Sequence, residues 1–512
     1  MGEPALRHQT ETVKSLIGDF RQGRIVIPEF QRDYVWKKSK APKLLDSIYR
    51  GFPISSLLVW KSTDDVLSRK GITKNRHAPE VNWLIDGQQR ITTLSRVFAG
   101  DEGIEVVFNP KQDEFSLANA ATKNSRDWIA VWEIWDDKQY RSRRKSFDAD
   151  GVTDKFESRL ERVRRILDYE VPTVTMIDHD FGDAVNAFER INTLGVKLKR
   201  EDIESAQIAA KHSGFIAKEV APFLDRVGRE GFNRLGIMHL FRACAFVASP
   251  DGRSRTPLHQ LSRETVLEAW KKVTRATQKA IDLMKSQLGL QNMDILWSGA
   301  LLVPIISLFA TRDSREICAE EIVGWLALAT LLHRYSGSSD TTIEQDLRAC
   351  RNDDPIAALL KNLRQIRPHL RASFRDFDGS LSDRGALLAA WISCSHAGVL
   401  DFHGEQTVRL HRDVERHHIL PRAQFSPEKR FRADNVANIG FICEGANKSL
   451  GQKSPEVYLP NISRHVLESQ LVPMEKSLWK ISRAEEFWKK RRQLLADAFN
   501  EFVRQRLPNR RL

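Results

Sequence analysis

The sequence predicts an α+β fold with several domains, because strand-forming segments near both ends of the chain flank a long helical middle. Between residues 199 and 382, apolar side chains recur at intervals of three and four, which is the spacing of one helix face. A chain of 512 residues is long enough for two or more domains, each with its own core. We expect three domains, at residues 1–200, 201–380 and 381–512, with a helical bundle as the connector in the middle.

The composition favours an anionic partner and a cytoplasmic protein. Lys and Arg number 80 against 67 Asp and Glu, which gives a formal net charge of +13, a balance that suits nucleic acid binding. The five cysteines form no Cys-x-x-Cys pair, so the sequence predicts neither a zinc ribbon nor a disulfide framework. It contains no apolar run near the ~20 residues of a membrane span, and no apolar signal-peptide core at its start.

The first hundred residues predict helices and short strands in alternation. We expect an amphipathic helix at about residues 41–50 and a strand at residues 52–60. A second apolar strand then runs into the sequence DGQQR, residues 86–90. A strand-to-helix turn of this kind presents backbone N–H groups and the positive end of a helix dipole to an anion, and Arg90 can bind phosphate through two N–H groups. We predict a phosphate site here, with an ordinary helix-capping turn as the alternative.

Three motifs in this order resemble the N-terminal domain of the GmrSD family of type IV, modification-dependent restriction endonucleases. They are IPEFQRDYVW at residues 27–36, DGQQR at residues 86–90 and FERINTLGVKL at residues 188–198. The resemblance implies a fold similar to ParB and sulfiredoxin that binds and hydrolyses a nucleoside triphosphate and senses modified DNA. The nucleotide pocket that it implies is lined by Gln31, Arg32, Asp86, Gly87, Gln88, Gln89, Arg90, Arg190 and Asn192. The chain contains no Walker loop, so hydrolysis would not use P-loop machinery.

The most informative segment is HHILP at residues 417–421, followed by a strand-forming run at residues 438–443 and by Asn447. Hydrolysis of a phosphodiester needs a base that deprotonates water and a hard cation that neutralises phosphate charge. Neighbouring side chains on a strand point to opposite faces, so His417 and His418 can serve one metal only if the strand ends or bends between them. Pro421 favours such an ending. We predict a β-hairpin followed by a helix that carries Asn447.

These residues resemble the HNH, or ββα-metal, nucleases, in the variant found at the C-terminus of GmrSD-type proteins. The resemblance makes His418 the general base, with His417 and Asn447 as ligands of a divalent ion, Mg²⁺ or Mn²⁺. Asn438 would orient the His418 imidazole or brace the loop, so the implied catalytic set is His418, Asn438 and Asn447. The variant more often has Glu-His where this chain has His-His, and two imidazoles suit Mn²⁺, Ni²⁺ or Zn²⁺ better.

Two basic segments are further candidates for contact with phosphates. The first contains Arg141, Arg143, Arg144 and Lys145. The second is a helix expected after Leu478, whose basic side chains are Lys489, Lys490, Arg491, Arg492, Arg504 and Arg506. An ordinary solvated helix face is the alternative for both segments.

Together these patterns predict a nucleotide-regulated, metal-dependent DNA endonuclease of an anti-phage defence system. Its partners would be modified phage DNA and a nucleoside triphosphate (ATP, GTP, CTP or UTP). A homodimer is expected, because a double-strand break needs two active sites or two successive nicks. Two alternatives remain open: an unspecific or RNA-directed nuclease or toxin with a regulatory N-terminal domain, and a ParB-like, nucleotide-dependent DNA-binding protein.

Overall fold

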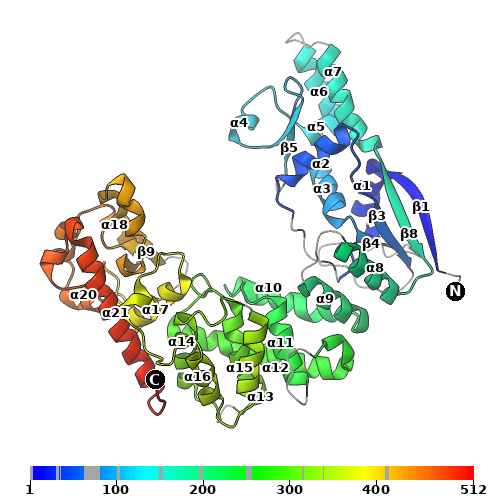
Figure 1. Cartoon of the computed structure of the whole chain (residues 1–512). Helices are drawn as coiled ribbons and strands as arrows, with labels where there is room; N and C mark the ends of the chain where they lie inside the picture. The colour runs from blue at the N-terminus through cyan, green and yellow to red at the C-terminus, as the bar shows by residue number, and fades with distance from the viewer. Residues whose placement is uncertain are drawn as a thin grey trace. The chain divides into compact units, whose positions relative to one another are not determined.

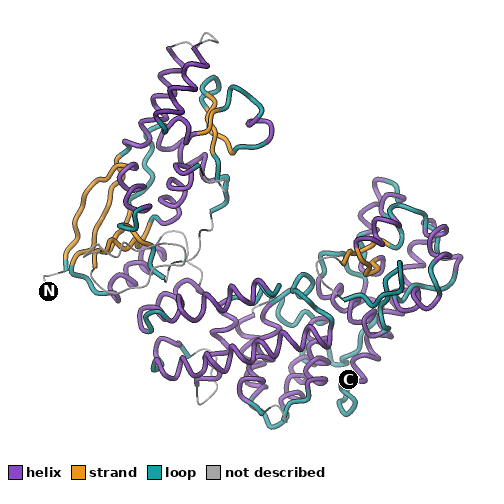
Figure 2. The backbone as a smooth tube through the Cα atoms, turned by 180° about the vertical axis from the view of Figure 1, so that it is seen from behind, coloured by secondary structure: helices purple, strands orange, loops and turns teal. Residues whose placement is uncertain are grey.

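In a computed structural model, the chain forms two compact units, residues 1–221 and 222–512. The fold is mixed α/β and about 59% helical, with few strands beside the helices (Figures 1 and 2). The structure describes all residues except 1–3, 30, 32, 33, 35, 63–80, 101–103, 149–153, 195–199, 250–255, 314, 315, 338 and 410–413. Of residues 143–148, 154, 155, 192–194, 200, 201 and 339 it describes the backbone. The three-domain division stays a prediction.

The first unit contains a mixed five-stranded sheet. Strands β1 and β8 are antiparallel, as are β3 and β4, whereas β8 and β3, and β4 and β2, are parallel. Trp60 and Trp83 face each other across β3 and β4 and are fully buried. The strands, in their order across the sheet, are β1 (Ala5–Thr12), β8 (Glu170–Ile177), β3 (Leu57–Ser62), β4 (Val81–Asp86) and β2 (Ile25–Val26).

Helices with one apolar face complete the core of this unit. Leu16, Leu45 and Leu94, from three different helices, are each at most 3% exposed in one continuous apolar cluster. The predicted helix at residues 41–50 corresponds to α2, whereas the predicted strand at residues 52–60 overlaps β3 only from Leu57 onward. The helices that follow the sheet strands are α1 (Val13–Arg21), α2 (Lys40–Tyr49), α3 (Gln88–Ala99) and α8 (Phe181–Leu194). The other helices are α4 (Ala120–Lys123), α5 (Val131–Trp135), α6 (Asp137–Asp148), α7 (Asp154–Arg164) and α9 (Arg200–Lys211). A three-stranded sheet adds β6 (Glu114–Leu117), β5 (Val106–Asn109) and β7 (Ile129–Ala130).

Glu29, in the first sequence motif, ties that motif to the last helical turn of the first unit. Its side chain is buried, and its two carboxylate oxygens accept hydrogen bonds from the N–H groups of Gly214 (2.9 Å) and Ala217 (3.0 Å). These N–H groups lie at the start of the π-helical turn Ile216–Val220, where free N–H groups favour a carboxylate. This motif residue therefore has a structural partner 185 positions further along the chain.

The second unit is largely helical, and no helix in the described part of the chain is long and apolar enough to cross a membrane. Its central helices α13 and α14 are almost entirely buried. Its helices before the hairpin are α10 (Ala221–Arg229), α11 (Ile237–Ala248), α12 (Arg263–Leu288), α13 (Val303–Thr311), α14 (Ala319–Leu331), α15 (Ser339–Cys350), α16 (Pro355–Arg364) and α17 (Arg384–His396). A hairpin of β9 (Val414–His418) and β10 (Ile439–Cys443) follows, and then α18 (Glu444–Leu450), α19 (Pro455–Tyr458), α20 (Arg464–Ser469) and α21 (Ala484–Arg506).

Arg491, on the final helix α21, holds the start of β10 in place. The side chain is fully buried and donates hydrogen bonds to the carbonyl oxygens of Ala437 (2.9 Å), Ile439 (2.7 Å) and Gln470 (3.0 Å). Burial lowers the pKa of this guanidinium from its ordinary value. The prediction that Arg491 belongs to a basic, phosphate-facing helix surface is therefore wrong. Because its N–H groups satisfy backbone oxygens, it supports the strand instead.

Gly87 connects β4 to α3 in a conformation that other residues adopt only at a cost. Its φ is +101°, and a Cβ built there would lie 2.1 Å from Leu57 Cδ2. We expect Gly87→Ala to lower the free energy of unfolding of the first unit by about 2 to 4 kcal/mol, the sum of backbone strain and overpacking. Denaturant titration followed by tryptophan fluorescence measures the change.

Gly51→Ala is the matched control, because Gly51 also has a positive φ (+75°) but a Cβ at that position would have no atom within 4 Å. Its cost should be only about 1 kcal/mol, from the backbone alone. Equal losses in the two variants would contradict the steric argument.

Candidate active site

The predicted β-hairpin and following helix are present near the end of the chain (Figure 1). Strands β9 and β10 pair in antiparallel register, with His418 opposite Ile439 and His417 opposite Gly440. Helix α18 begins directly after β10 and carries Asn447. Both histidines belong to β9, which ends at His418, so the strand ends after the pair and not between its members. Both nevertheless line one cavity.

His417 is a buried, neutral imidazole. Its Nδ1 lies 2.8 Å from Asn447 Oδ1, and its Nε2 lies 3.4 Å from the Tyr458 hydroxyl. Tyr458 donates its own proton to the carbonyl of Ile419 (2.7 Å), so it offers only a lone pair to His417 Nε2. Burial lowers the pKa of His417, although the contact with Asn447 opposes this shift. Because an amide oxygen only accepts hydrogen bonds, the single N–H of the neutral ring lies on Nδ1 and donates to Asn447 Oδ1.

The pair formed by His417 Nδ1 and Asn447 Oδ1 fits a divalent cation. These two atoms lie 2.8 Å apart, so both would be within reach of one bound ion. For Nδ1 to bind an ion, the ring proton would have to be on Nε2, which faces the Tyr458 hydroxyl oxygen. Among the described residues no group of three or more His, Cys, Asp or Glu could hold a metal. Two protein ligands suit Mg²⁺, which keeps several waters.

His418 faces a carboxylate that the sequence motifs do not include. Its Nε2 lies 3.0 Å from Asp434 Oδ1, and the side chains are 25% and 32% exposed, respectively. Asp434 also lies 3.6 Å from Arg422 Nε through its other oxygen. His418 is therefore partly accessible and has one ring nitrogen engaged by an acidic partner.

Asn438 braces the loop that follows the histidines. It is fully buried; its Oδ1 accepts a hydrogen bond from Leu420 N, and its Nδ2 donates to the carbonyls of Leu420 and Ala433, all at 2.9 Å. Its own carbonyl accepts from Ile419 N (2.8 Å). These contacts brace the loop. The family resemblance allows this role for Asn438, or the alternative role of orienting the His418 imidazole.

The two histidines open onto a cavity of about 760 Å³. Its described lining includes three arginines and no acidic residue. Guanidinium groups bind phosphate oxygens in a bidentate manner, so this lining suits an anionic polymer. The polar lining residues are Arg416, His417, His418, Arg422, Arg430, Asn447 and Gln452.

In the first unit, the structure brings two of the predicted nucleotide-binding motifs together. Gln31, which is buried, donates from Nε2 to the carbonyls of Leu84 and Ile85 (3.0 Å to the latter), at the end of β4. Gln89 Oε1 accepts a hydrogen bond from Trp36 N (3.1 Å). The first motif therefore lies against the strand and helix that flank Gly87.

Arg90 is engaged by protein oxygens. It donates to the carbonyls of Ile54 (2.7 Å) and Ser56 (2.9 Å) and to Asp86 Oδ2 (2.9 Å), with its side chain 13% exposed. Burial lowers its pKa, and the Asp86 carboxylate opposes that shift. Its predicted contact with phosphate stays a prediction, and the structure adds a role in fixing the loop before β3.

The remaining predicted nucleotide residues are only partly described by the structure. Gln88 is buried at the start of α3. Arg190 is exposed on α8, a helix that packs against β4. Arg32 and the side chain of Asn192 lie outside the described residues, as do the side chains of residues 143–145.

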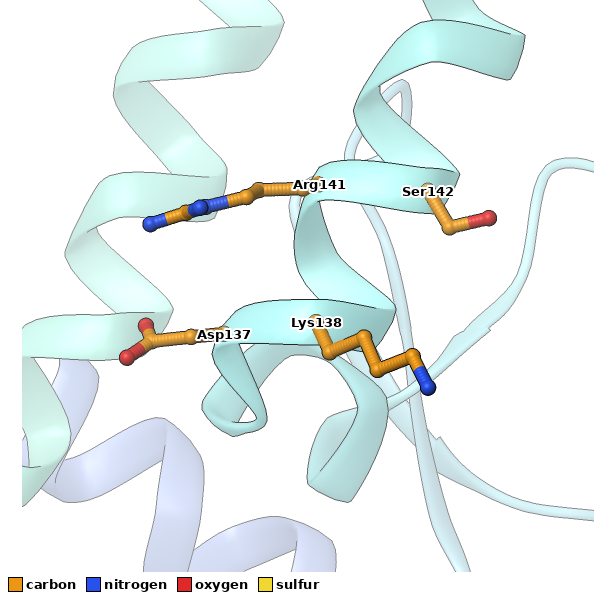
Figure 3. A pocket seen from close by; sticks show the side chains of 4 residues that line it. All are labelled: Asp137, Lys138, Arg141 and Ser142. Carbon is orange, nitrogen blue, oxygen red and sulfur yellow. The ribbon is translucent and has the colours of Figure 1, made fainter.

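Helix α6 lines a second, smaller cavity of about 440 Å³. Figure 3 shows that Asp137 and Arg141 point to one side of the helix and Lys138 and Ser142 to the other. Asp137 forms an ion pair with Arg164. These side chains do not converge on a common point, so they do not form a binding site together.

Three polar residues around the hairpin have no counterpart in the sequence motifs: Asp434, Tyr458 and Arg491. They come from separate segments and reach the hairpin only through the fold. Asp434 stands next to Asn435 in the sequence, but a polar pair in a loop is an ordinary turn signal. Sequence spacing alone therefore gives no sign of their roles.

Comparison with known proteins supports a relationship for the first unit. Residues 13–209 match the family model described as the GmrSD restriction endonuclease, N-terminal domain. The chain is also similar to an uncharacterized protein of Methanocaldococcus jannaschii, at 21% identity over 520 residues, a match that covers 89% of this chain and 87% of that protein. The family model covers most of the first unit and ends before the hairpin.

We expect Asn438→Ala to lower the free energy of unfolding of the second unit by about 2 to 4 kcal/mol. The variant loses three hydrogen bonds and leaves buried backbone groups of Leu420 and Ala433 without a partner. Asn461→Ala is the control, because Asn461 is exposed and bonds only within its own turn. Urea titration compares the two midpoints, and equal midpoints would rule out the brace.

Proposed function

We propose that the protein is a metal-dependent DNA endonuclease of the restriction type that acts in defence against phage and is regulated by a nucleoside triphosphate. The observation that carries the proposal is the convergence of His417, His418 and Asn447 at one arginine-lined cavity. The match of residues 13–209 to a restriction endonuclease family supports the same function from the other unit.

The chemistry requires one proton acceptor and one anion site. His418 would take a proton from water; the water oxygen bonds to phosphorus, the bond from phosphorus to the leaving sugar oxygen breaks, and that oxygen takes a proton from solvent. A divalent ion, Mg²⁺ or Mn²⁺, held by His417 and Asn447 would neutralise charge on the phosphate. The burial of His417 keeps it neutral, which is the form that binds a metal.

The cavity also suits a nucleic acid backbone. Arg416 and Arg430 are exposed and line the cavity beside His418. Phosphate contacts of this kind position a duplex without reading its sequence. Recognition of modified DNA would then belong to the first unit, in line with the resemblance of its motifs.

Nucleotide binding is proposed at the turn from β4 to α3. Asp86 is 34% exposed there, and the start of a 12-residue helix, α3, lies directly after Gly87. Helix N-termini favour phosphate through free N–H groups and the helix dipole. One cutting site per chain would require a second copy for a concerted double-strand break, so we also propose a homodimer on DNA.

We expect His418→Ala to reduce nicking of plasmid DNA in Mg²⁺ by at least about 100-fold, because the general base is lost. Conversion of supercoiled to relaxed and linear plasmid measures the rate, with EDTA as the metal-free arm. His465→Ala is the control, because His465 is exposed and forms an ion pair with Glu405, away from the cavity lining. Cutting by His418→Ala at the wild-type rate would remove His418 from the mechanism.

The same assay separates the competing functions. Glucosylated or hydroxymethylated phage DNA should be cut faster than unmodified DNA, and RNA should not be cut. Equal cutting of modified and plain DNA would contradict modification dependence, and preferential cutting of RNA would favour the RNA-directed nuclease. Binding of DNA without any cleavage would favour the ParB-like DNA-binding protein.

We expect Arg90→Ala to reduce nucleoside triphosphate hydrolysis by at least about tenfold, through loss of a phosphate contact. Phosphate release from ATP, GTP, CTP and UTP measures the change. Arg96→Ala is the control, because Arg96 lies on the same helix but stacks on the Tyr34 ring, 4.6 Å from its centroid.

Because Arg90 also holds two backbone carbonyls, the unfolding midpoint of each variant must accompany the rates. A folded Arg90→Ala protein with unchanged turnover of all four nucleotides would exclude Arg90 from a nucleotide pocket.

A further inference from the structure

We infer that Asp434 is the positioning residue for His418: its carboxylate accepts the Nε2–H of the imidazole and so leaves Nδ1 as the atom that takes a proton from water. The inference rests on the proposed nuclease function, which it deepens. None of the sequence motifs contains Asp434. The contact that carries the inference is the 3.0 Å approach of Asp434 Oδ1 to His418 Nε2.

The backbone around Asp434 is held on both sides. Asp434 O accepts a hydrogen bond from Leu381 N (3.1 Å), and the preceding carbonyl, that of Ala433, accepts from Asn438 Nδ2 (2.9 Å). The next residue, Asn435, forms a β-bridge with Ser380. The carboxylate therefore projects from a fixed segment.

The two partners are held by the same side chain. Asn438 bonds to Leu420, two residues after His418, and to Ala433, one residue before Asp434. This shared brace sets the distance between imidazole and carboxylate. Because the backbone on both sides of this contact is held in place, the pair differs from a surface ion pair, whose side chains are free to move.

The chemistry of the pair determines which ring nitrogen is the base. A carboxylate only accepts hydrogen bonds, so a neutral His418 facing it must carry its proton on Nε2. The lone pair then lies on Nδ1, which is the ring nitrogen that can accept a proton from water. Arg422 Nε lies 3.6 Å from the other oxygen of Asp434.

Histidine-selective ¹⁵N labelling of the full chain tests the assignment without any cleavage measurement, with His418→Ala identifying the signal. The wild-type signal should be that of an Nε2–H imidazole. In Asp434→Asn an Nδ1–H form should appear, because an amide can either accept from or donate to Nε2.

Steady-state cleavage in Mg²⁺ is the second measurement. We expect kcat of Asp434→Asn to fall about 10- to 100-fold, with KM for DNA and the Mg²⁺ requirement changed less than about threefold. Asp434→Glu should recover part of kcat. Glu428→Gln is the control, because Glu428 lies on the same segment and its exposed carboxylate bonds to Ser426. Its His418 tautomer and its kcat should both match wild type.

Two outcomes would overturn the inference. An unchanged tautomer in a folded Asp434→Asn protein would show that Asp434 does not set the ring, whatever the activity. A raised Mg²⁺ requirement at unchanged kcat would make Asp434 a metal ligand. If the tautomer changes as expected but His418→Ala still cuts DNA, then the proposed role of His418 fails while the positioning contact stands.

Discussion

The buried amide of Asn438 is the interaction on which the geometry of the candidate site depends. It joins the chain just after the two histidines to the chain just before Asp434, and Arg491 holds the strand that begins next to it. Both side chains bond to backbone groups in the interior, where an unpaired polar group is costly. The hairpin is therefore held from two sides before any substrate or ion arrives.

The sequence predicted local features of this site well. The strand that ends ahead of Pro421, the second strand and the helix with Asn447 follow from local composition, which acts over a few residues. Asp434, Tyr458 and the buried role of Arg491 could not be predicted in this way, because each depends on a tertiary contact. Arg491 shows the reason most clearly: on a helix with several lysines and arginines, periodicity indicates a solvated face, whereas one guanidinium of that series fills the interior.

The first unit shows the same division between local and tertiary signals. The turn at Gly87 was predicted from a strand that runs into DGQQR, and the structure has β4, a glycine with positive φ and α3 in that order. The hydrogen-bond partners of the motif side chains, in contrast, were not predicted from the sequence. Gln31, Glu29 and Arg90 all bond to backbone groups of distant segments, so part of what makes these motifs recognisable is the architecture of the unit. Their chemistry toward a nucleotide is a separate question, which the Arg90 variant addresses.

The bonds that Asn438 and Arg491 form have a consequence for comparing sequences. They end on main-chain atoms of Leu420, Ala433, Ala437 and Ile439, and a main-chain atom is the same whatever side chain follows it. Those four positions can drift among apolar residues while the scaffold keeps its shape. Two chains could thus share this geometry at very low identity, and a search for its distant relatives should weight one asparagine and one arginine far above the residues they hold.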